Sequence, residues 1–409
     1  INGLFLTEIA KTVIDNSRDA YPELADKKEH IFKVLEREEE NFNKTIDQGL
    51  LILNGYKEEL EKEGSKTLSG ENAFKLYDTY GFPIDLTKEI LEEESIEVDE
   101  EGFKKFMDIQ KDTARKARKV SNYMGADATV YEELDPNIGT EFKGYSNSEL
   151  SSKIFAITKN SGDANTLSES IEEGENGSII TFETPFYGTM GGQKGDIGQI
   201  EVNGNVFVVE DTIHVAGGKI AHLGYVKEGV LNVGDEVNLS INSSNRNDVC
   251  KNHTATHLLQ KALRLVLGDH VEQAGSYVDG QRLRFDFTHF SAMTDDEIKK
   301  VENIVNTKIA ENIGVKTDIM SIDDAKKTGA MALFGEKYGD TVRVVSVSDF
   351  SIELCGGTHV KETGVINNFK IISESGVASG VRRIEAITGN EVKNYFDSLE
   401  SKLIEVSKI

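Results

Sequence analysis

The segment Asn252-His-Thr-Ala-Thr-His-Leu-Leu259 places two histidines four residues apart in a stretch that is typical of a helix. Side chains at positions i and i+4 lie on the same helical face, so His253 and His257 can point at one metal ion. Farther along the chain, Cys355-Gly-Gly-Thr-His359 repeats this spacing around a pair of glycines that allow a tight turn. Three imidazoles and one thiolate form a ligand set that suits zinc. We therefore predict a zinc site made of His253, His257, Cys355 and His359.

The neighbouring residues argue against two other interpretations of this pattern. The familiar protease motif needs a Glu directly after the first histidine, where this chain has Thr254. Cys250 lies three residues before His253 and competes as a ligand, but we interpret it as a small buried hydrophobic residue. The remaining histidines lack partners at useful spacing and are interpreted as structural or surface residues: His30, His214, His222, His270 and His289.

The composition is typical of a protein with several domains and no disulfide scaffold. The chain has 409 residues, enough for two or three domains, and 38% of them are hydrophobic. It has two cysteines and no apolar run that could span a bilayer, so we expect a cytoplasmic location. Because it starts with Ile1 rather than Met and ends without a clear stop, we expect both ends to be cut from a longer protein.

The formal net charge of −25 argues against nucleic-acid binding as a global property. Local patches can oppose a global sum, however, and one segment is basic. The helix predicted over residues 104–119 carries Lys104, Lys105, Lys111, Arg115, Lys116, Arg118 and Lys119. This stripe is predicted either to bind a nucleic-acid backbone or to be a solvated helix face.

Hydrophobic periodicity predicts an α+β multidomain protein with four parts. Residues 1–125 show helical spacing and are expected to form a helical domain. Residues 126–245 show short alternating runs and tight turns such as Asn203-Gly204, which predict a small β-barrel with a glycine-rich motif. Residues 246–392 mix helices and strands around the metal motif in an α+β core, and residues 393–409 begin a truncated C-terminal helix.

Several segments, in their order along the chain, resemble the alanyl-tRNA synthetase family. The two histidine motifs resemble the zinc-binding editing domain of that family. Three more segments are similar to the same domain: the glycine-rich stretch 184–196, His270-Val-Glu-Gln-Ala-Gly-Ser276, and Ala378-Ser-Gly-Val-Arg-Arg-Ile-Glu-Ala386. In the helical part, residues 19–24 and 76–85 resemble the tRNA-recognition region. The resemblance implies a fragment that lacks the family's aminoacylation domain and its C-terminal domain.

The resemblance implies a whole protein that joins alanine to tRNA(Ala), with ATP and Mg²⁺ used only by the missing aminoacylation domain. The fragment itself is expected to bind tRNA(Ala) and one Zn²⁺ and to hydrolyse Ser-tRNA(Ala) and Gly-tRNA(Ala). A pocket shaped for alanine excludes glycine and serine poorly, so a second site that recognises the serine hydroxyl is useful. Any oligomerisation of the whole protein is expected to depend on the missing C-terminal region.

Individual residues are given roles from this resemblance and from their chemistry. In the catalytic site, Gln273 is expected to orient the ester or a water, Thr184 to recognise the serine hydroxyl, and Cys355 to hold the metal. Asp78 is expected to recognise the wobble pair of the acceptor stem, with turn capping as the alternative.

Phosphate contacts are expected from two other groups of residues. Arg382 and Arg383 are expected near the tRNA 3′ end, with ion pairs to neighbouring acids as the alternative. Arg115, Lys116 and Lys119 are expected to contact the tRNA backbone. Glycines 188, 191, 192, 195 and 198 are expected to let their loop approach the pocket or the tRNA end, or else to form turns between strands.

Two further hypotheses stay open. The first is a tRNA-binding module with a structural zinc and no catalysis, in which chelation unfolds the C-terminal part. The second is a zinc hydrolase for a small molecule, against which the basic helix and residues 77–85 count. Four protein ligands fill a tetrahedral site, so zinc either activates water with one ligand loosely held or only positions the substrate.

Overall fold

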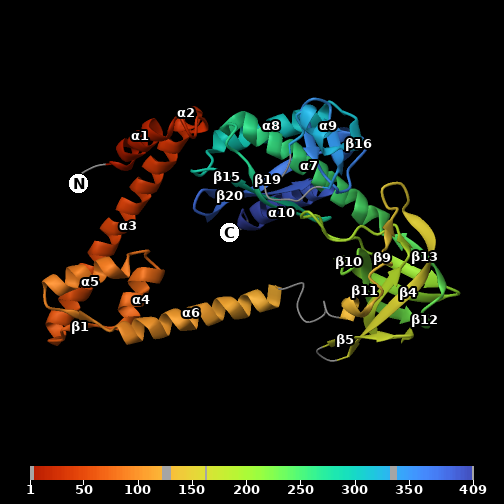
Figure 1. Cartoon of the computed structure of the whole chain (residues 1–409), viewed down its shortest axis with the longest axis horizontal. Helices are drawn as coiled ribbons and strands as arrows, with labels where there is room; N and C mark the ends of the chain where they lie inside the picture. Colours follow the sequence, from red (N-terminus) through yellow and green to blue (C-terminus); the bar gives the residue numbers. More distant parts are fainter. Residues whose placement is uncertain (1–3, 122–129, 162–163, 332–338, 408–409) are drawn as a thin grey trace. The chain divides into compact units, whose positions relative to one another are not determined.

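The computed structural model describes residues 4–121, 130–161, 164–331 and 339–407. The chain divides into two compact units, Ile1–Gly125 and Ala126–Ile409, and each is described by itself. Figure 1 labels their helices and strands. Among the described residues, none of the helices combines the length and the apolar character that crossing a bilayer requires.

The first unit consists of helices and one small parallel pair of strands, in agreement with the helical spacing of its sequence (Figure 1). Its helices are α1 (Leu6–Ser17), α2 (Glu23–Asp26), α3 (Lys28–Glu63), α4 (Gly70–Asp78), α5 (Ile84–Glu93) and α6 (Glu100–Ser121). Strands β1 (Thr67–Leu68) and β2 (Glu97–Val98) pair with each other. The buried core of this unit includes Leu53, Leu68, Leu76, Phe82 and Leu91.

Two side chains fix where the central helices of this unit begin. Ser69 caps α4 by accepting a hydrogen bond from the backbone N–H of Asn72 at 3.3 Å. The carboxylate of Asp99 accepts from the N–H groups of both Gly70 and Gly102, so it joins the starts of α4 and α6. A Cβ at Gly70 would lie 2.3 Å from backbone atoms of α6, so this contact requires glycine.

The second unit opens with a closed β-barrel, as expected from the alternating runs. Its strands are β4 (Glu149–Ser161), β7 (Asn176–Thr181), β9 (Gly198–Val202), β10 (Asn205–Val215), β11 (Lys219–Glu228) and β13 (Glu236–Ile241). They are ordered β13-β9-β10-β11-β7-β4, and β4 pairs with β13 to close the ring. The other elements here are η2 (Val130–Glu133), β3 (Glu141–Phe142), β5 (Ala164–Ser168), β6 (Ser170–Glu172), β8 (Glu183–Thr184) and β12 (Val230–Asn232).

The predicted turn at Asn203-Gly204 sets the register of one barrel hairpin. Both residues have positive φ angles, 50° and 87°, as a two-residue hairpin turn requires. Val202 and Asn205 therefore face each other across β9 and β10. This register places Ile200 and Phe207 in the barrel core.

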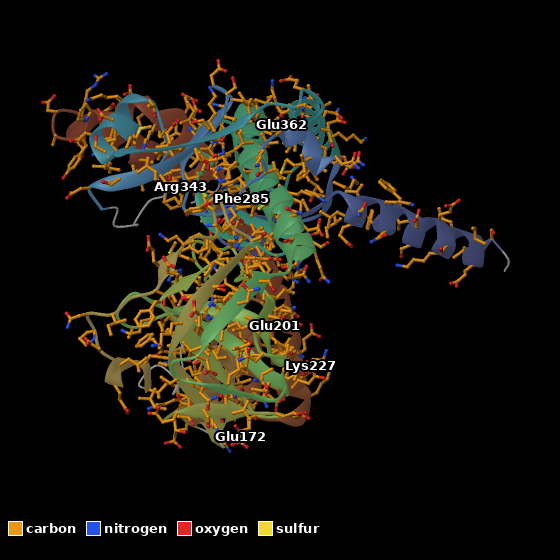
Figure 2. All side chains as sticks on the ribbon, turned by 90° about the vertical axis from the view of Figure 1, so that its right-hand side faces the viewer. Glu172, Glu201, Lys227, Phe285, Arg343 and Glu362 are labelled. Carbon is orange, nitrogen blue, oxygen red and sulfur yellow. The ribbon has the colours of Figure 1, made fainter. Side chains whose placement is uncertain are left out.

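The rest of the second unit is an α+β core. Strands β14 (Gln273–Val278), β15 (Leu283–Thr288), β20 (Val381–Thr388) and β19 (Phe369–Ala378) form one antiparallel sheet in that order. Strands β16 (Val315–Ser321), β17 (Thr341–Val347) and β18 (Ser351–Leu354) form a second. The helices are α7 (Ser243–Leu267), α8 (Asp295–Ala310), α9 (Ile322–Lys327), η3 (Thr363–Ile366) and α10 (Asn390–Val406). Figure 2 marks Phe285, Arg343 and Glu362 in this core and Glu172, Glu201 and Lys227 on the barrel.

Helix α7 begins at Ser243, upstream of the 252–259 segment that the sequence identifies as helical. Its first part is polar and lacks the apolar spacing that identifies a helix. Asn242 caps it by accepting from the N–H of Asn245 at 3.0 Å. This polar part carries Arg246, a buried arginine that contacts the barrel.

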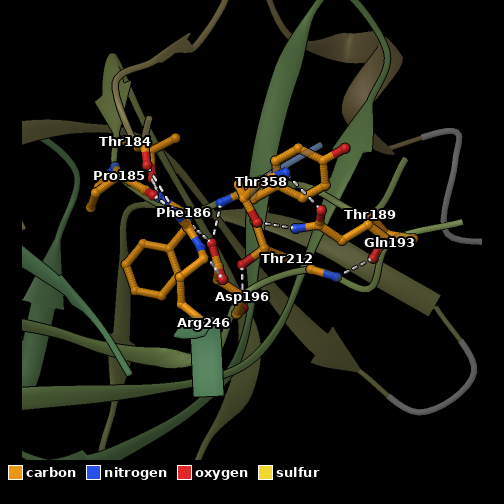
Figure 3. Close-up of polar contacts among 12 residues, drawn as sticks. Thr184, Pro185, Phe186, Thr189, Gln193, Asp196, Thr212, Arg246 and Thr358 are labelled. Carbon is orange, nitrogen blue, oxygen red and sulfur yellow. Dashed lines mark hydrogen bonds and ion pairs between the residues drawn. The ribbon is translucent and has the colours of Figure 1, made fainter. Parts of the chain in front are cut away.

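Arg246 joins α7 to the barrel through a buried ion pair with Asp196 (Figure 3). Its Nε lies 2.8 Å from the Asp196 carboxylate, and its terminal nitrogens also donate to the carbonyl oxygens of Gly144 and Pro185. Asp196 accepts a further bond from the N–H of Tyr187 at 2.6 Å. Burial lowers the pKa of Arg246, but the hydrogen bond and charge of Asp196 more than offset this and raise it. The guanidinium thus donates through all three of its nitrogens to acceptors inside the protein.

Replacing Arg246 by Met should destabilise the second unit strongly. The change keeps an unbranched apolar stem but removes the guanidinium and leaves the Asp196 carboxylate buried without its partner, which typically costs about 3–5 kcal/mol. Urea unfolding measures the loss. Arg37→Ala is the control, because Arg37 pairs with Glu40 at an exposed site and should change stability by less than about 1 kcal/mol. Equal effects of the two substitutions would contradict the structural role of Arg246.

Candidate metal centre and its pocket

Four side chains from two segments meet in the α+β core. His253 and His257 lie four residues apart on α7, and Cys355 and His359 follow strand β18. One ligand atom of each lies within 4.8 Å of the others. The Cys355 Sγ lies 3.5 Å from Nε2 of His253 and 3.3 Å from Nε2 of His359. Nitrogen and sulfur ligands of a tetrahedral zinc lie about 3.5 Å apart, so this cluster could hold a metal ion.

The turn between Cys355 and His359 is held from three sides. A Cβ at Gly357 would lie 2.0 Å from the ring of His253, so the turn can approach α7 only with glycine there. Nη1 of Arg343 donates to the carbonyl oxygens of Cys355 and Gly357, both at 2.8 Å. The Tyr145 hydroxyl donates to the carbonyl oxygen of Gly356 at 2.5 Å. The tight turn predicted from the two glycines is therefore present and anchored.

Each histidine of the cluster has a partner for its outer ring nitrogen. Nδ1 of His253 lies 2.7 Å from Oε1 of Gln193, which cannot donate, so this nitrogen carries the proton. Nδ1 of His257 lies 2.9 Å from a carboxylate oxygen of Glu353. Nδ1 of His359 lies 3.1 Å from the hydroxyl of Thr254. Such partners leave Nε2 of each ring available to a metal and fix the ring orientation.

The electrostatics of the cluster favour a thiolate. Burial raises the pKa of the Cys355 thiol, but the neighbouring imidazoles of His253, His359 and His257 outweigh it and hold the pKa well below its usual range. Burial lowers the pKa of His257, while the charges of Glu353 and Cys355 raise it well above the ordinary value. Burial lowers the pKa of His359 to about 3. A thiolate among imidazoles is the form that binds a metal.

The cluster lines a pocket of about 40 Å³, which is room for a few water-sized groups. Besides His253, His257 and Cys355, its lining consists of Gly191, Thr256, Gln260, Gln273, Ser276, Met331, Glu353 and Leu354. The structure thus brings Gln273, the first residue of β14, into the same pocket as three of the four clustered residues, His253, His257 and Cys355. A pocket of this size admits only a small group.

Thr184 lies elsewhere, which does not fit the role expected from the sequence. Its side chain is fully buried in the barrel, and its hydroxyl lies 2.7 Å from Nε2 of His222. Nδ1 of His222 bonds to the carbonyl oxygen of Ile179, so Nε2 is the acceptor and Thr184 the donor. The hydroxyl also accepts from the N–H of Phe186 (Figure 3). The donor hydrogen of Thr184 is therefore engaged within the barrel, and Thr184 is not among the residues that line the pocket.

Three of the charged residues expected to contact tRNA, Arg382, Arg383 and Asp78, have partners within the protein. Arg382 makes two contacts of 2.6 Å with the carboxylate of Glu374, and Arg383 makes two of 2.7 Å with Asp286. These are the ion pairs weighed as the alternative to phosphate contacts. Asp78 is exposed at the end of α4 and accepts a hydrogen bond from the side chain of Gln110. The side chains of Arg115, Lys116, Arg118 and Lys119 lie outside the described residues, whereas those of Lys104, Lys105 and Lys111 are exposed.

The glycine-rich loop packs against neighbouring strands and also reaches the pocket. A Cβ at Gly192 would lie 2.5 Å from the carbonyl oxygen of Ser276, and one at Gly195 would lie 2.1 Å from that of Thr212. Gly191 lines the pocket. The loop thereby delivers Gln193, which sequence reasoning missed, to the outer nitrogen of His253. Cys250 is buried in the apolar core, as interpreted from the sequence, and is not one of the clustered residues.

The chain resembles known protein families over most of its length. Residues 1–245 match the family described as tRNA synthetases class II (A). Residues 342–385, which contain Cys355 and His359, match the family described as Threonyl and Alanyl tRNA synthetase second additional domain.

Curated relatives cover the whole chain. Alanine–tRNA ligase 1 of Lachnoclostridium phytofermentans is 60% identical over 409 residues, which is 100% of this chain and 46% of the relative. Alanine–tRNA ligase of Acetivibrio thermocellus is 49% identical over 99% of this chain, and that of a Thermoanaerobacter species is 48% identical over 100%. The chain spans 46% of the length of each of these relatives.

Loss of the Gln193 side-chain contact should weaken metal binding. We expect Gln193→Leu to lower Zn²⁺ affinity about 10–100-fold, the usual effect of removing an outer partner of a metal-bound histidine. Competition with a chromogenic chelator measures this affinity. Gln199→Leu, the same substitution at an exposed position of β9, is the control and should leave the affinity unchanged. Unaltered affinity in Gln193→Leu would show that the contact with His253 does not support the site.

Proposed function

Because this chain belongs to the alanyl-tRNA synthetase family, we propose that its metal pocket removes wrongly attached amino acids from tRNA(Ala). The reaction is hydrolysis of the ester bond of Ser-tRNA(Ala) and Gly-tRNA(Ala). The observation that supports this proposal most directly is the shared pocket of Gln273 and the metal-binding cluster. The match to the second additional domain of threonyl and alanyl synthetases includes Cys355 and His359 of that cluster.

The size of the pocket supports a small acyl group as its substrate. Glycine and serine are close in size to alanine, and a synthetic site for alanine discriminates poorly against both. A second site that hydrogen-bonds the serine hydroxyl can reject alanine, because a methyl group leaves the polar groups of the site without a partner. The pocket is lined by the polar side chains that such a site needs, among them Thr256, Gln260, Gln273 and Ser276.

Zinc is the metal that the donor set fits best. Three imidazole nitrogens and one thiolate, gathered within 4.8 Å of one another and with outer-nitrogen partners, are a typical zinc environment. A bound zinc ion would supply Lewis-acid chemistry or a fixed positive charge in the pocket. The protein's own residues orient the substrate: Gln273 can donate to the ester carbonyl and accept from a water, because a carboxamide has both functions.

The wider activity of the whole protein is part of the same proposal. We propose that the whole protein is a ligase that attaches alanine to tRNA(Ala) with ATP and Mg²⁺. Within this chain, Lys104, Lys105 and Lys111 on α6 are exposed cations that support contacts with a phosphate backbone. The Asp78 carboxylate is exposed and retains acceptor capacity beside Gln110, which supports contact with a base.

A second candidate function is a tRNA-binding module with a structural metal. It is favoured by one feature: four protein ligands fill a tetrahedral site and leave no open position for water. In that case the metal holds the turn of residues 355–359 against α7, and its removal unfolds the core.

The deacylation assay decides between these candidates. The zinc-loaded chain should hydrolyse Ser-tRNA(Ala) at least tenfold faster than Ala-tRNA(Ala), and Cys355→Ala should abolish the difference by removing a ligand. Loss of the labelled amino acid from the tRNA is the measurement. Cys250→Ala is a matched control, since it changes the chain's other cysteine outside the cluster. Hydrolysis of neither substrate by zinc-loaded protein would favour the binding module.

Gln273 should affect the rate of deacylation but not the binding of zinc. We expect Gln273→Leu to slow hydrolysis of both seryl- and glycyl-tRNA(Ala), by about 10–1000-fold, because it removes a group that orients the reacting atoms. Single-turnover deacylation rates and the zinc content of the same protein are measured together. Full zinc content with unchanged rates would contradict the role of Gln273.

A further inference from the structure

Besides its two candidate metal ligands, helix α7 contributes two further side chains to the lining of the pocket. Residues 253, 256, 257 and 260 follow the i, i+3, i+4, i+7 spacing of one helical face, and all four line the pocket. Gln260 is not one of the four candidate metal ligands, and it lies outside the segments that resemble the synthetase family. Its side chain is 2% exposed, so its carboxamide is almost completely removed from water.

The carboxamide of Gln260 has a weak partner. Its Nε2 lies 2.9 Å from the thioether sulfur of Met331, which is a poor hydrogen-bond acceptor. Met331 is fixed in place, because its backbone bonds on both sides to strand β18 through Ile352 and Leu354. A buried amide gains free energy when such a weak acceptor is replaced by an oxygen.

Two other polar groups of the same lining, on or beside α7, are better satisfied. The hydroxyl of Thr256 donates to the carbonyl oxygen of Asn252 at 2.9 Å, within its own helix. Glu353 contacts His257 and accepts from the hydroxyl of Ser351 at 2.7 Å. Gln260 therefore has the greatest unused capacity among these three groups on or beside α7.

We propose that Gln260 is the specificity-determining residue that recognises the side-chain hydroxyl of serine on mischarged tRNA. The inference rests on the proposed deacylase function and assigns to Gln260 the role that the sequence suggested for Thr184. The serine hydroxyl exchanges the sulfur contact of Gln260 for a hydrogen bond between the carboxamide and oxygen. Alanine offers a methyl group and glycine offers no side chain, so neither gains this bond. The hydroxyl preference thus comes from a residue two helical turns from the first ligand, His253.

The test compares seryl and glycyl substrates. The zinc-loaded 409-residue chain and its Gln260→Met variant, which keeps a long unbranched side chain, are assayed for kcat/KM on both charged tRNAs. We expect the variant to lose about 10–100-fold on Ser-tRNA(Ala) and less than about threefold on Gly-tRNA(Ala), because only serine uses the carboxamide. Gln260→Asn, which keeps the amide but shortens its reach, should show the same selective loss. Met331→Leu, which removes only the sulfur, should leave the seryl rate equal or higher.

The outcomes separate this inference from the function on which it rests. Equal losses on both substrates in Gln260→Met and Gln260→Asn would overturn the specificity role and leave Gln260 as a structural residue. Unchanged seryl rates in both variants would overturn it as well. Hydrolysis of neither substrate by the zinc-loaded parent chain would instead overturn the proposed deacylase function itself, and the role of Gln260 with it. Zinc content and thermal unfolding of each variant show whether a loss of rate reflects a loss of fold.

Discussion

The carboxamide of Gln193 holds together the two segments that carry the metal ligands. Its Oε1 contacts Nδ1 of His253 on α7 and accepts from the backbone N–H of Thr358 in the turn, while its Nε2 donates to the Thr358 hydroxyl. Because Gln193 belongs to the barrel, the spacing of the ligands depends on how the barrel docks against α7. That docking depends in turn on the buried pair of Arg246 and Asp196. The barrel therefore helps to position the metal ligands.

A buried group of three imidazoles and a thiol is stable only if its polar atoms are satisfied. The structure meets this requirement from outside the cluster, with Gln193, Glu353 and Thr254 on the ring nitrogens and Arg343 on the carbonyl oxygens of the turn. Each of these contacts also limits the rotation of a ligand. The same bonds that offset the burial of the polar groups thus also restrain the orientation of the ligands.

The sequence predicted those features that depend on neighbouring residues. The ligand pair on α7, the glycine turn at residues 355–359 and the hairpin at Asn203 all follow from local spacing. The contacts of Gln193, Glu353 and Arg343 join segments far apart in the chain, so no local pattern reveals them. The start of α7 was not predicted because it is polar and carries Arg246, whose buried partner Asp196 lies far away in the sequence, in the barrel. The position of Thr184 could not be predicted for a similar reason, since the pairing of β8 with β3 decides which side of β8 faces His222.

The displacement of Thr184 from the pocket changes how the chemistry is divided among the residues. If four protein ligands occupy the metal, discrimination between acyl groups cannot come from a water on an open coordination position. It must come from the rest of the lining, whose polar side chains include Gln260 and Gln273. The weakest hydrogen bond in that lining is the one from Gln260 to the Met331 sulfur. A hydroxyl-bearing substrate offers the Gln260 amide a stronger acceptor than the thioether sulfur, and this argument favours α7 over the barrel as the source of specificity.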